Sequence, residues 1–338
     1  MCRWLAATVV AAVTALSMGV TTAVAATQPE LLVVPFRTTP GAVADTEIDL
    51  TPADQGAPPA KMVLYVPAGY SVALNQPVGT KIADVAARVS SGGSQLSANG
   101  QVVVDSPAKY TSDPKAQACA AGTHAAVWLI QVGTLALPMF VDPATSLGSY
   151  QAQLCLPSPE VPESAGGAPG GVRLLEADLD FANTFTNPSA AGLGTWRAFV
   201  TPYTPGTAAP NPAGTVEVRS IAIFPFTVSL KGRYDKRHRR AVLTGVVRFA
   251  TLKPSGFGVL ILSATSARFT NPKAFAVART KRGGTFTVRK RITRTLFFTP
   301  FVPPTSSSTC TEAPTGTTPC TGQTTSPAFG PLVRVRKR

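Results

Sequence analysis

The sequence predicts an all-β protein made of two β-sandwich domains, of which the second is immunoglobulin-like. Short stretches that alternate apolar and polar residues recur along the chain between Pro and Gly, which is the pattern of β-strands joined by turns. Few stretches show the apolar period of 3.6 residues that is typical of a helix. The composition is also rich in Val, Thr, Pro and Gly and poor in charged residues.

The first part of the chain carries a series of these alternating segments. The segments predicted as strands are 31–36, 45–50, 61–67, 80–89, 100–105, 125–132, 134–141, 150–156, 172–181, 195–203 and 215–224. Gly133 lies between two of them and predicts a tight hairpin. Residues 158–171 read as a long surface loop. The Pro-rich stretch 201–214 is expected to be a long hairpin connection inside the first domain, because strands flank it on both sides.

The character of the sequence changes near Pro225, and we place the domain boundary there, between residues 27–224 and 225–338. The segments predicted as strands beyond it are 226–230, 239–250, 258–265, 274–280, 284–292, 296–302 and 331–338. Gly283 and Gly284 predict a hairpin between two of them. The basic stretch 231–240, KGRYDKRHRR, is expected to be the exposed loop that joins the first two. About seven short strands with turns at this spacing fit an immunoglobulin-like sandwich.

Several short motifs of the second domain recur in a known group of modules. They are Leu243 with Gly245, Gly256 to Val259, Gly284 with Phe286, and Leu296 to Phe298. With them, residues 226–338 resemble the immunoglobulin-like repeat domains of secreted proteins from high-GC Gram-positive bacteria. The turn in those domains usually carries an acidic residue, whereas here it carries Lys281 and Arg282. The resemblance implies a β-sandwich module, often structural or adhesive, with no catalytic residues to carry over.

The first domain resembles the N-terminal part of uncharacterised secreted proteins from the same bacteria. This second resemblance implies no activity.

Residues 1–26 have the pattern of a cleaved secretory signal peptide. Arg3 supplies a positive N-terminal flank, residues 5–20 are apolar apart from Thr and Ser, and small residues precede a cleavage after Ala25 or Ala26. A transmembrane anchor is the alternative, but the apolar run is short and the residues that follow it are small and uncharged. No other apolar run is long enough to span a bilayer. We therefore expect a secreted protein, extracellular or associated with the cell envelope, without a transmembrane segment in its mature chain.

Export lets the cysteines be read as disulfides. Removal of the signal peptide takes away Cys2 and leaves an even number, which in an oxidising compartment predicts two disulfides. The remaining cysteines are Cys119, Cys155, Cys310 and Cys320. Three pairings are possible, and proximity in the sequence favours Cys119 with Cys155 and Cys310 with Cys320. No C-x-x-C spacing supports a zinc site.

The two domains carry opposite charge. The whole chain has a net charge of +14, but residues 27–224 have nine Lys or Arg against fifteen Asp or Glu, a net charge of −6. Residues 225–338 have 21 Lys or Arg against two carboxylates, Asp235 and Glu312, a net charge of +19. Such asymmetry between the halves of a chain indicates an anionic partner.

The candidate anion-binding residues lie in the stretch 231–240, in the turn near residue 281 and in the C-terminal tail. They are Lys231, Arg233, Lys236, Arg237, Arg239, Arg240, Lys281, Arg282, Arg334 and Arg336. Residues 288–294, VRKRITR, add to this basic character. In the tail, Val333 and Val335 alternate with Arg334 and Arg336, so a strand here would show both arginines on one face. An anionic wall polymer or a membrane surface fits an exported protein better than nucleic acid does, because specific nucleic-acid binders add stacking aromatics or a groove-reading element.

Two segments of the first domain place their carboxylates on one strand face. They hold Asp45, Glu47 and Asp49, and Glu176, Asp178 and Asp180. If these strands were neighbours, six like charges would oppose one another, which destabilises a sheet. We therefore expect the strands to lie apart, or a cation to compensate them, either Ca²⁺ or the basic domain itself. The plain alternative is a solvated strand face. No EF-hand-like loop supports Ca²⁺, and we predict no metal site and no cofactor.

The sequence offers no evident catalytic centre. His124 begins an apolar strand and reads as a histidine at the edge of the core, while His238 lies among basic neighbours with only Asp235 to orient it. There is no G-x-S-x-G motif and no phosphate-binding loop. A carboxylate pair for sugar hydrolysis could still be hidden among the acidic residues, because their separation in space cannot be read from the sequence.

The function expected from the sequence is that of a secreted, non-catalytic structural or interaction protein, held on an anionic cell-envelope surface by its basic domain. The alternative is a carbohydrate-binding β-sandwich module, for which Trp196 with Tyr203 would be the aromatic platform, although Trp196, like Trp128, fits a core position. Self-association of acidic on basic faces is a further possible use of the charge.

Overall fold

The computed structural model describes residues 29–52, 57–250, 253–310 and 320–337, with only the backbone for 306–310 and 320–324. The protein is all-β, as the sequence predicts. The segment predicted as a signal peptide and Glu312 lie outside the described residues. Within the ranges just given, no helix is long and apolar enough to cross a bilayer.

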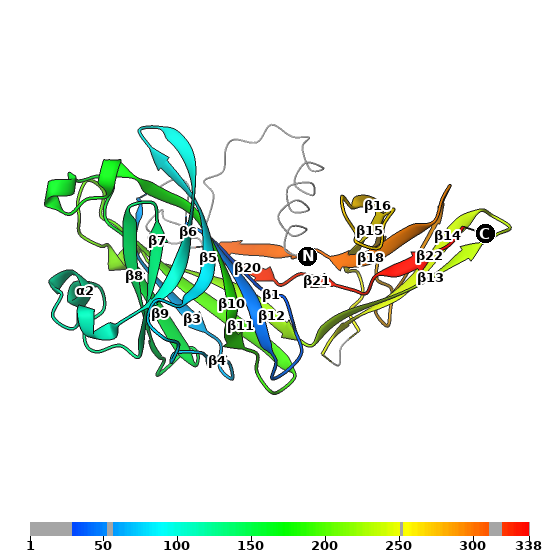
Figure 1. Ribbon diagram of the computed structural model, residues 1–338, viewed down its shortest axis with the longest axis horizontal. Coiled ribbons are helices and arrows are strands. Elements are labelled where there is room, and N and C mark those ends of the chain that lie inside the picture. Colours follow the sequence, from blue (N-terminus) through cyan, green and yellow to red (C-terminus); the bar gives the residue numbers. More distant parts are fainter. Residues whose placement is uncertain (1–28, 53–56, 251–252, 311–319, 338) are drawn as a thin grey trace.

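The N-terminal region, residues 29–224, forms one large sheet that curls on itself (Figure 1). Its strands are β1 (Glu30–Pro35), β2 (Val43–Thr51), β3 (Pro59–Val66), β4 (Ser71–Val72), β5 (Lys81–Ser91), β6 (Ser94–Asp105), β7 (Ala126–Val132), β8 (Leu135–Pro143), β9 (Tyr150–Cys155), β10 (Arg173–Thr186), β11 (Gly192–Pro202) and β12 (Val216–Phe224). The order across the sheet is β1-β2-β10-β5-β6-β7-β8-β9-β3-β11-β12, and β4 pairs with β10.

Turns and short helices connect these strands. The helical elements are η1 (Pro107–Tyr110), α2 (Pro114–Cys119), η2 (Glu163–Ala165), η3 (Pro169–Gly171) and η4 (Pro212–Gly214). The predicted hairpin at Gly133 is confirmed: the residue has a φ of 58°, which a glycine adopts without strain, and β7 pairs with β8. The long connection predicted over 201–214 is also confirmed, because β11 pairs with β12 on either side of it.

The C-terminal region, residues 225–337, contains two further sheets that face each other across a shared core. Its strands are β13 (Phe226–Asp235), β14 (Arg240–Phe249), β15 (Gly258–Ala264), β16 (Lys273–Arg279), β17 (Thr285–Arg291), β18 (Leu296–Val302), β21 (Ala328–Phe329) and β22 (Val333–Val335). One sheet has the order β13-β14-β17, and the other has β16-β15-β18 with β21 and β22 both pairing with β18. Leu243, Ile261, Phe286 and Phe298 are almost fully buried between them.

The turn at Gly283 and Gly284 does not form the predicted hairpin. Both glycines have positive φ, and Lys281 N donates to Thr285 O at 2.7 Å, so the chain does reverse tightly. However, β16 pairs with β15 in one sheet, whereas β17 pairs with β14 in the other. The turn therefore carries the chain from one sheet to the other. The two glycines correctly predict that the chain reverses here, but they do not predict which strands pair.

A second hairpin of the C-terminal region extends the large sheet of the N-terminal region. It consists of β19 (Ser306–Cys310) and β20 (Cys320–Thr325), which leave the C-terminal region after β18 and return to it at β21. β20 pairs in parallel with β12, with Ser220 opposite Thr324. The sequence did not predict this hairpin, because its Ser, Thr and Gly residues carry no apolar alternation. The two regions are thus linked by a shared sheet as well as by the chain at Pro225.

The curled sheet closes at a seam where its edge strand β1 lies beside β12. Here hydroxyl groups take the place of a regular ladder: Val33 N donates to Ser220 Oγ at 2.9 Å, and Ser326 Oγ donates to Val33 O at 2.7 Å. Ser326 N in turn donates to Ile221 O at 3.0 Å. Both serines are fully buried. The seam thus satisfies both backbone groups of Val33 on the edge strand β1, and Ser326 brings the hairpin β19–β20 into this closure.

One half of the curled sheet is filled by aromatic side chains. They form a continuous series of ring contacts, with centroid separations between 5.1 and 5.7 Å, that runs through Trp128, Phe181, Phe185, Trp196, Tyr70 and Phe224. Most of these contacts are edge-to-face, the arrangement that aromatic quadrupoles favour. Trp196 is completely buried, which confirms the core interpretation of this residue.

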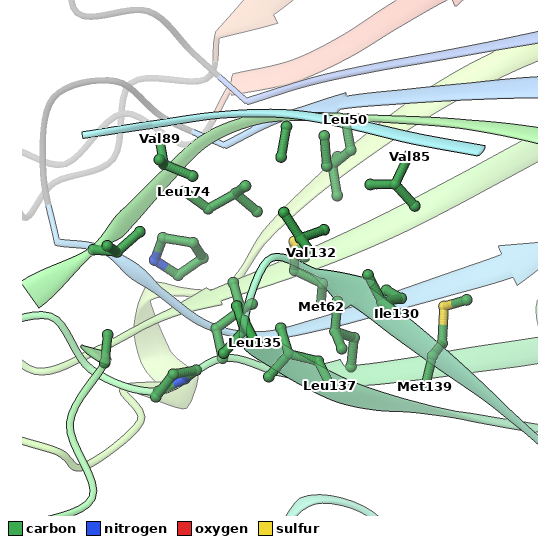
Figure 2. A pocket seen from close by; sticks show the side chains of 18 of the residues that line it. Leu50, Met62, Val85, Val89, Ile130, Val132, Leu135, Leu137, Met139 and Leu174 are labelled. Atoms are coloured by element: carbon green, nitrogen blue, oxygen red, sulfur yellow. The ribbon is translucent and has the colours of Figure 1, made fainter. Parts of the chain in front are cut away.

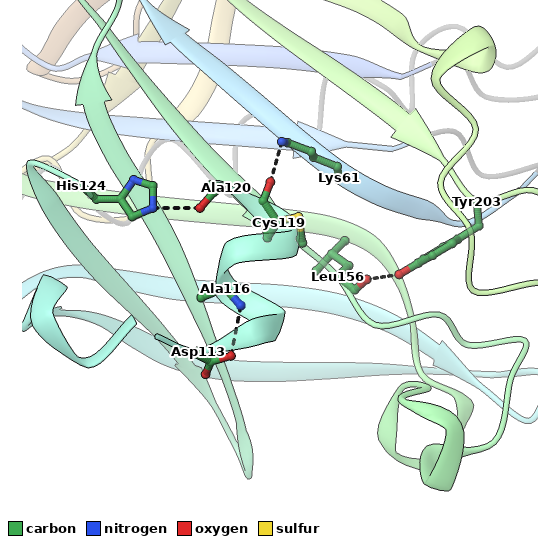
Figure 3. Close-up of a disulfide and its surroundings, with 9 residues drawn as sticks. Lys61, Asp113, Ala116, Cys119, Ala120, His124, Leu156 and Tyr203 are labelled. Atoms are coloured by element: carbon green, nitrogen blue, oxygen red, sulfur yellow. Dashed lines mark hydrogen bonds between the residues drawn. A yellow bond between two sulfur atoms is a disulfide. The ribbon is translucent and has the colours of Figure 1, made fainter. Parts of the chain in front are cut away.

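The disulfide predicted between Cys119 and Cys155 is present (Figure 3). It joins the end of α2 to the end of β9, and Asp113 caps the helix by accepting from Ala116 N. Cys310 and Cys320 lie directly opposite each other on β19 and β20. This backbone placement has the spacing that a disulfide requires, but their side chains lie outside the description, so the second pair stays a prediction.

The seam gives a first testable expectation. Ser326→Ala removes the buried hydroxyl that satisfies Val33 O, so the free energy of unfolding should fall by about 1–3 kcal/mol. Chemical denaturation would measure this change. Ser94→Ala, on the exposed end of β6, is the control and should leave stability within about 0.5 kcal/mol of the parent. Equal stability of the two variants would mean that the seam hydroxyl does not contribute.

Candidate anion-binding surface

The basic stretch 231–240 is part of two strands and not a loop. β13 runs to Asp235 and β14 begins at Arg240, so only residues 236–239 form the turn. The expected loop is shorter because Lys231, Arg233 and Arg240 fit the outward positions of paired strands, where a long charged side chain can reach water. The turn itself exposes Lys236, Arg237 and Arg239 at the tip of the hairpin.

Two other segments of the C-terminal region lie against this turn. Ile292 N donates to Arg239 O at 3.3 Å, which places the connection between β17 and β18 beside it. Lys337 Nζ donates to Thr293 O at 3.0 Å, which places the C-terminal tail on the same connection. Figure 1 accordingly shows the C-terminus beside the ends of β13 and β14, far from the N-terminal region.

The basic residues of these three segments therefore gather at one end of the molecule. We call this group the basic end; its members are Lys236, Arg237, Arg239, Arg240, Arg291, Arg294, Arg336 and Lys337. All are exposed except Arg240, which is partly buried and lies opposite Arg291 in the β14–β17 ladder. Like charges placed directly opposite each other weaken a sheet, so the fold accepts a cost at this position.

The basic end contains one acidic residue, Asp235, which is already engaged. Its carboxylate accepts from His238 Nδ1 at 2.9 Å and from Arg240 Nε at 3.0 Å. The hydrogen bond from His238, helped by that from Arg240, lowers the pKa of Asp235 to about 2. The carboxylate is thus ionised at neutral pH and holds the turn in place, which leaves the turn cations pointing to solvent.

The outer face of the β13-β14-β17 sheet continues the positive surface beside the basic end. Arg233 and Arg289 flank Val242 in one row across the three strands, and Lys231 lies in the next row. All three cations are exposed. The end and this face together can contact an anionic surface over more than one strand.

Three predicted residues lie elsewhere. Lys281 and Arg282 precede β17 and lie at the opposite end of its sheet, because β17 runs from Thr285 toward the basic end. Arg334 lies on the other sheet, with its guanidinium 5.5 Å from the ring centroid of Phe297. Arg334 and Arg336 are both exposed while Val335 is buried, as the alternation predicts.

Four basic residues at or beside the basic end were not among the predicted anion-binding residues. They are Arg291, Arg294 and Lys337 at the basic end, and Arg289 on the adjoining face. The run 288–294 is visible as a basic run in the sequence, but only the strand register places it beside Arg240. Long-range pairing of strands cannot be read from local spacing, so no signal in a single sequence joins these residues to the turn.

The two acidic strands are neighbours, which corrects the expectation that they lie apart. Asp49 on β2 is directly opposite Asp178 on β10, and Glu47 is directly opposite Asp180. Asp45 on β2 and Glu176 on β10 continue the row of carboxylates on each strand. We call these six carboxylates the acidic ladder. Glu176 pairs with Arg88 on β5 at 2.9 Å.

Protonation offers the acidic ladder a way to reduce its repulsion. Burial, together with the charges of Asp178 and Asp180, raises the pKa of Glu47 to about 7. Burial and the neighbouring carboxylates likewise raise the pKa of Asp49 to about 7 and that of Asp178 to about 6. Among the described residues, no group of three or more His, Cys, Asp or Glu side chains is arranged to hold a metal ion.

The two histidines have structural partners. His124 is almost fully buried; its Nδ1 lies 2.8 Å from Asp142 Oδ2 and its Nε2 lies 3.1 Å from Ala120 O (Figure 3). Its ring also packs on Phe140. Both ring nitrogens are therefore occupied by groups that fix the loop after α2, as the sequence interpretation of a histidine at the core edge proposes.

The proposed aromatic platform for a sugar is not at the surface. Trp196 and Tyr203 are both buried, and the Tyr203 hydroxyl donates to Leu156 O. These two rings cannot stack on a sugar in this conformation.

No protein-family model matches the sequence, and no curated protein matches it significantly.

The acidic ladder gives a prediction about pH. Its raised pKa values mean that the folded protein holds protons more tightly than the unfolded chain, so stability from these groups is present below about pH 4 and is lost as the pH rises through 6 to 7. Asp178→Asn should therefore raise the free energy of unfolding at pH 8 by about 1 kcal/mol, a value reduced because the group is partly exposed. The gain should shrink at pH 4.5.

Denaturation of both proteins at the two pH values would test this expectation. Glu163→Gln, on the exposed helix η2 away from the ladder, is the control and should show no gain that depends on pH. An equal gain from Asp178→Asn at both pH values would contradict repulsion as its cause.

Proposed function

We propose that the protein is an exported, non-catalytic interaction protein that attaches to an anionic surface of the cell envelope through its basic end. The observation that carries this proposal is the convergence of eight cations from three chain segments at the end of the C-terminal region farthest from the N-terminal region. Export itself is inferred from the pattern of residues 1–26 and from the disulfide between Cys119 and Cys155, since disulfides persist in oxidising compartments.

The placement of charge favours attachment by the basic end. Residues 225–338 contain only Asp235 and Glu312 as acidic side chains, and Asp235 is held by His238 and Arg240. A cation near an anionic membrane contributes about 1 kcal/mol, so several that face one way give a substantial but salt-sensitive attraction. The acidic ladder belongs to the N-terminal region, so repulsion from the same surface would keep that region outward.

We propose further that the C-terminal region is an immunoglobulin-like module. The order of its strands supports this: the first, second and fifth share one sheet, and the third, fourth and sixth share the other with the last strand, β22. Strands A, B and E, and strands C, F and G, are separated in the same way in immunoglobulin-like sandwiches, with C′ beside C in the variable type. Modules of this kind commonly serve as spacers and contact surfaces, which fits attachment by one end.

Vesicle binding tests the proposed attachment. The triple variant Lys236→Glu, Arg237→Glu and Arg239→Glu reverses the charge of the turn, and its affinity for vesicles that contain phosphatidylglycerol should fall by about tenfold or more. The parent should bind these vesicles but not phosphatidylcholine vesicles, and salt should release it. Co-sedimentation at low and high salt would measure both effects.

The matched control is Arg279→Glu with Lys281→Glu and Arg282→Glu. It changes the net charge of the protein by the same amount but acts at the end of the C-terminal region opposite the basic end, so it should keep most of the affinity. Equal loss in the two triple variants would show a diffuse positive domain without a binding end. Binding of the parent that does not respond to salt would overturn the proposal.

A further inference from the structure

The half of the curled sheet opposite the aromatic cluster is hollow. It encloses a cavity of about 350 Å³, within the range of small-molecule sites. The lining side chains come from strands on opposite sides of the curled sheet and point toward one another. Figure 2 shows this for Val85 and Leu174 on one side and for Met62, Ile130 and Leu137 on the other. The cavity therefore lies inside the sheet and is not a groove on its surface.

A row of small residues creates this space. Ala98 on β6, Ala87 on β5 and Ala177 on β10 are consecutive partners across three strands, and all three line the cavity. At the other end of the same sheet, the inward positions hold Phe181 and Phe185 on β10. The sequence thus places aromatic rings where the sheet is filled and single methyl groups where it is open.

The lining is apolar but incompletely buried. Inward-facing aliphatic residues of this half keep part of their surface exposed, although they pack against the main core; they include Leu137, Leu156, Leu174, Ile130 and Val132. In the C-terminal core, by contrast, Leu243 and Ile261 are completely buried. Leaving aliphatic side chains exposed forgoes hydrophobic stabilisation, and an apolar ligand would recover it.

The rim of the cavity is held in a fixed shape. Leu156 and Pro157 line it directly after Cys155, whose disulfide anchors the end of β9. The Tyr203 hydroxyl donates to Leu156 O beside that disulfide (Figure 3), and Ser158 Oγ donates to Thr207 O at 3.1 Å. A rim fixed by a covalent bond and side-chain hydrogen bonds fits a preformed ligand site, because such sites change little on binding.

The two ends of the cavity differ in polarity. Among the described residues that line it, Arg173 at the start of β10 is the one that carries a charge. At the inner end, Met139 lines both the cavity and a small adjoining pocket that Trp128 also lines. A ligand with one polar, anionic end and one apolar end would match this gradient if its anionic end lay at Arg173 and its apolar end pointed to Trp128.

The volume limits the size of the ligand. A methylene group occupies about the volume of a water molecule in the liquid, about 30 Å³, so a cavity of about 350 Å³ has room for roughly a dozen carbon atoms. This is enough for one unbranched chain of about that length.

We propose that this cavity binds a single-chain aliphatic carboxylic acid of about a dozen carbons, with its carboxylate at Arg173 and its chain end toward Trp128. The site is separate from the basic end and does not depend on the attachment proposed above. Binding would be saturable, with one ligand per chain.

Dodecanoate is the probe for this proposal. Ala87→Phe places a phenyl ring in the cavity, and it should weaken dodecanoate binding by about tenfold or more, measured by isothermal titration calorimetry on protein stripped of lipid. Ala86→Phe is the matched control: Ala86 is the preceding residue on β5, is exposed and points away from the cavity. It should bind as the parent does. Circular dichroism establishes that each variant is folded, and Ala177→Leu fills the same row with a smaller side chain should Ala87→Phe not fold.

Brominated probes test the orientation. Bromine quenches tryptophan on contact, so 12-bromododecanoate should quench the fluorescence of Trp128 more strongly than 2-bromododecanoate. The reverse order would place the carboxylate inside and overturn the orientation. Absence of saturable dodecanoate binding, binding by Ala87→Phe equal to that of the parent, or equal affinity for dilauroylphosphatidylglycerol would overturn the assignment of the ligand.

Discussion

The seam between β1 and β12 is the constraint on which the N-terminal region depends. A sheet this long must end in two edges, and exposed edges with unpaired backbone groups invite pairing with other chains. Here the edge strand β1 meets β12, and Ser220 and Ser326 supply the hydrogen bonds that Val33 needs. Without that closure the sheet would not enclose a core, and neither the aromatic half nor the hollow half would exist as an interior.

The alternation of apolar and polar side chains correctly predicted many strands and which face of each is buried. It gave no information on which strands pair with each other. It placed Asp49 and Asp178 on outward faces correctly, and it placed Val335 inward. It could not show that Asp49 and Asp178 are directly opposite, because that depends on which of many strands become neighbours. Of the two expectations, strands apart or a compensating cation, the first was wrong, because β2 and β10 are neighbours. The raised pKa values of these carboxyl groups let protonation relieve part of the repulsion.

The same limit explains what was missed at the candidate sites. The basic character of residues 231–240 is evident in the sequence, but the contribution of Arg291 needs the β14–β17 register. The cavity is less visible still. Ala87, Ala98 and Ala177 are unremarkable residues in the sequence, and only their alignment across three strands opens the interior. The hairpin β19–β20 could not be predicted either, because its residues show no alternation of apolar and polar side chains. Backbone pairing at a sheet edge holds it in place.

That hairpin also determines how the two ends of the molecule are related. A single covalent connection at Pro225 would allow the C-terminal region to turn freely, as linked domains commonly do. The parallel pairing of β20 with β12 adds a second connection, and Thr38 Oγ1 adds a third by donating to Phe226 O at 3.0 Å. Connections at separated points oppose rotation about any one of them. The basic end therefore has a fixed direction relative to the cavity, so attachment of the one would set how the mouth of the other faces the surface.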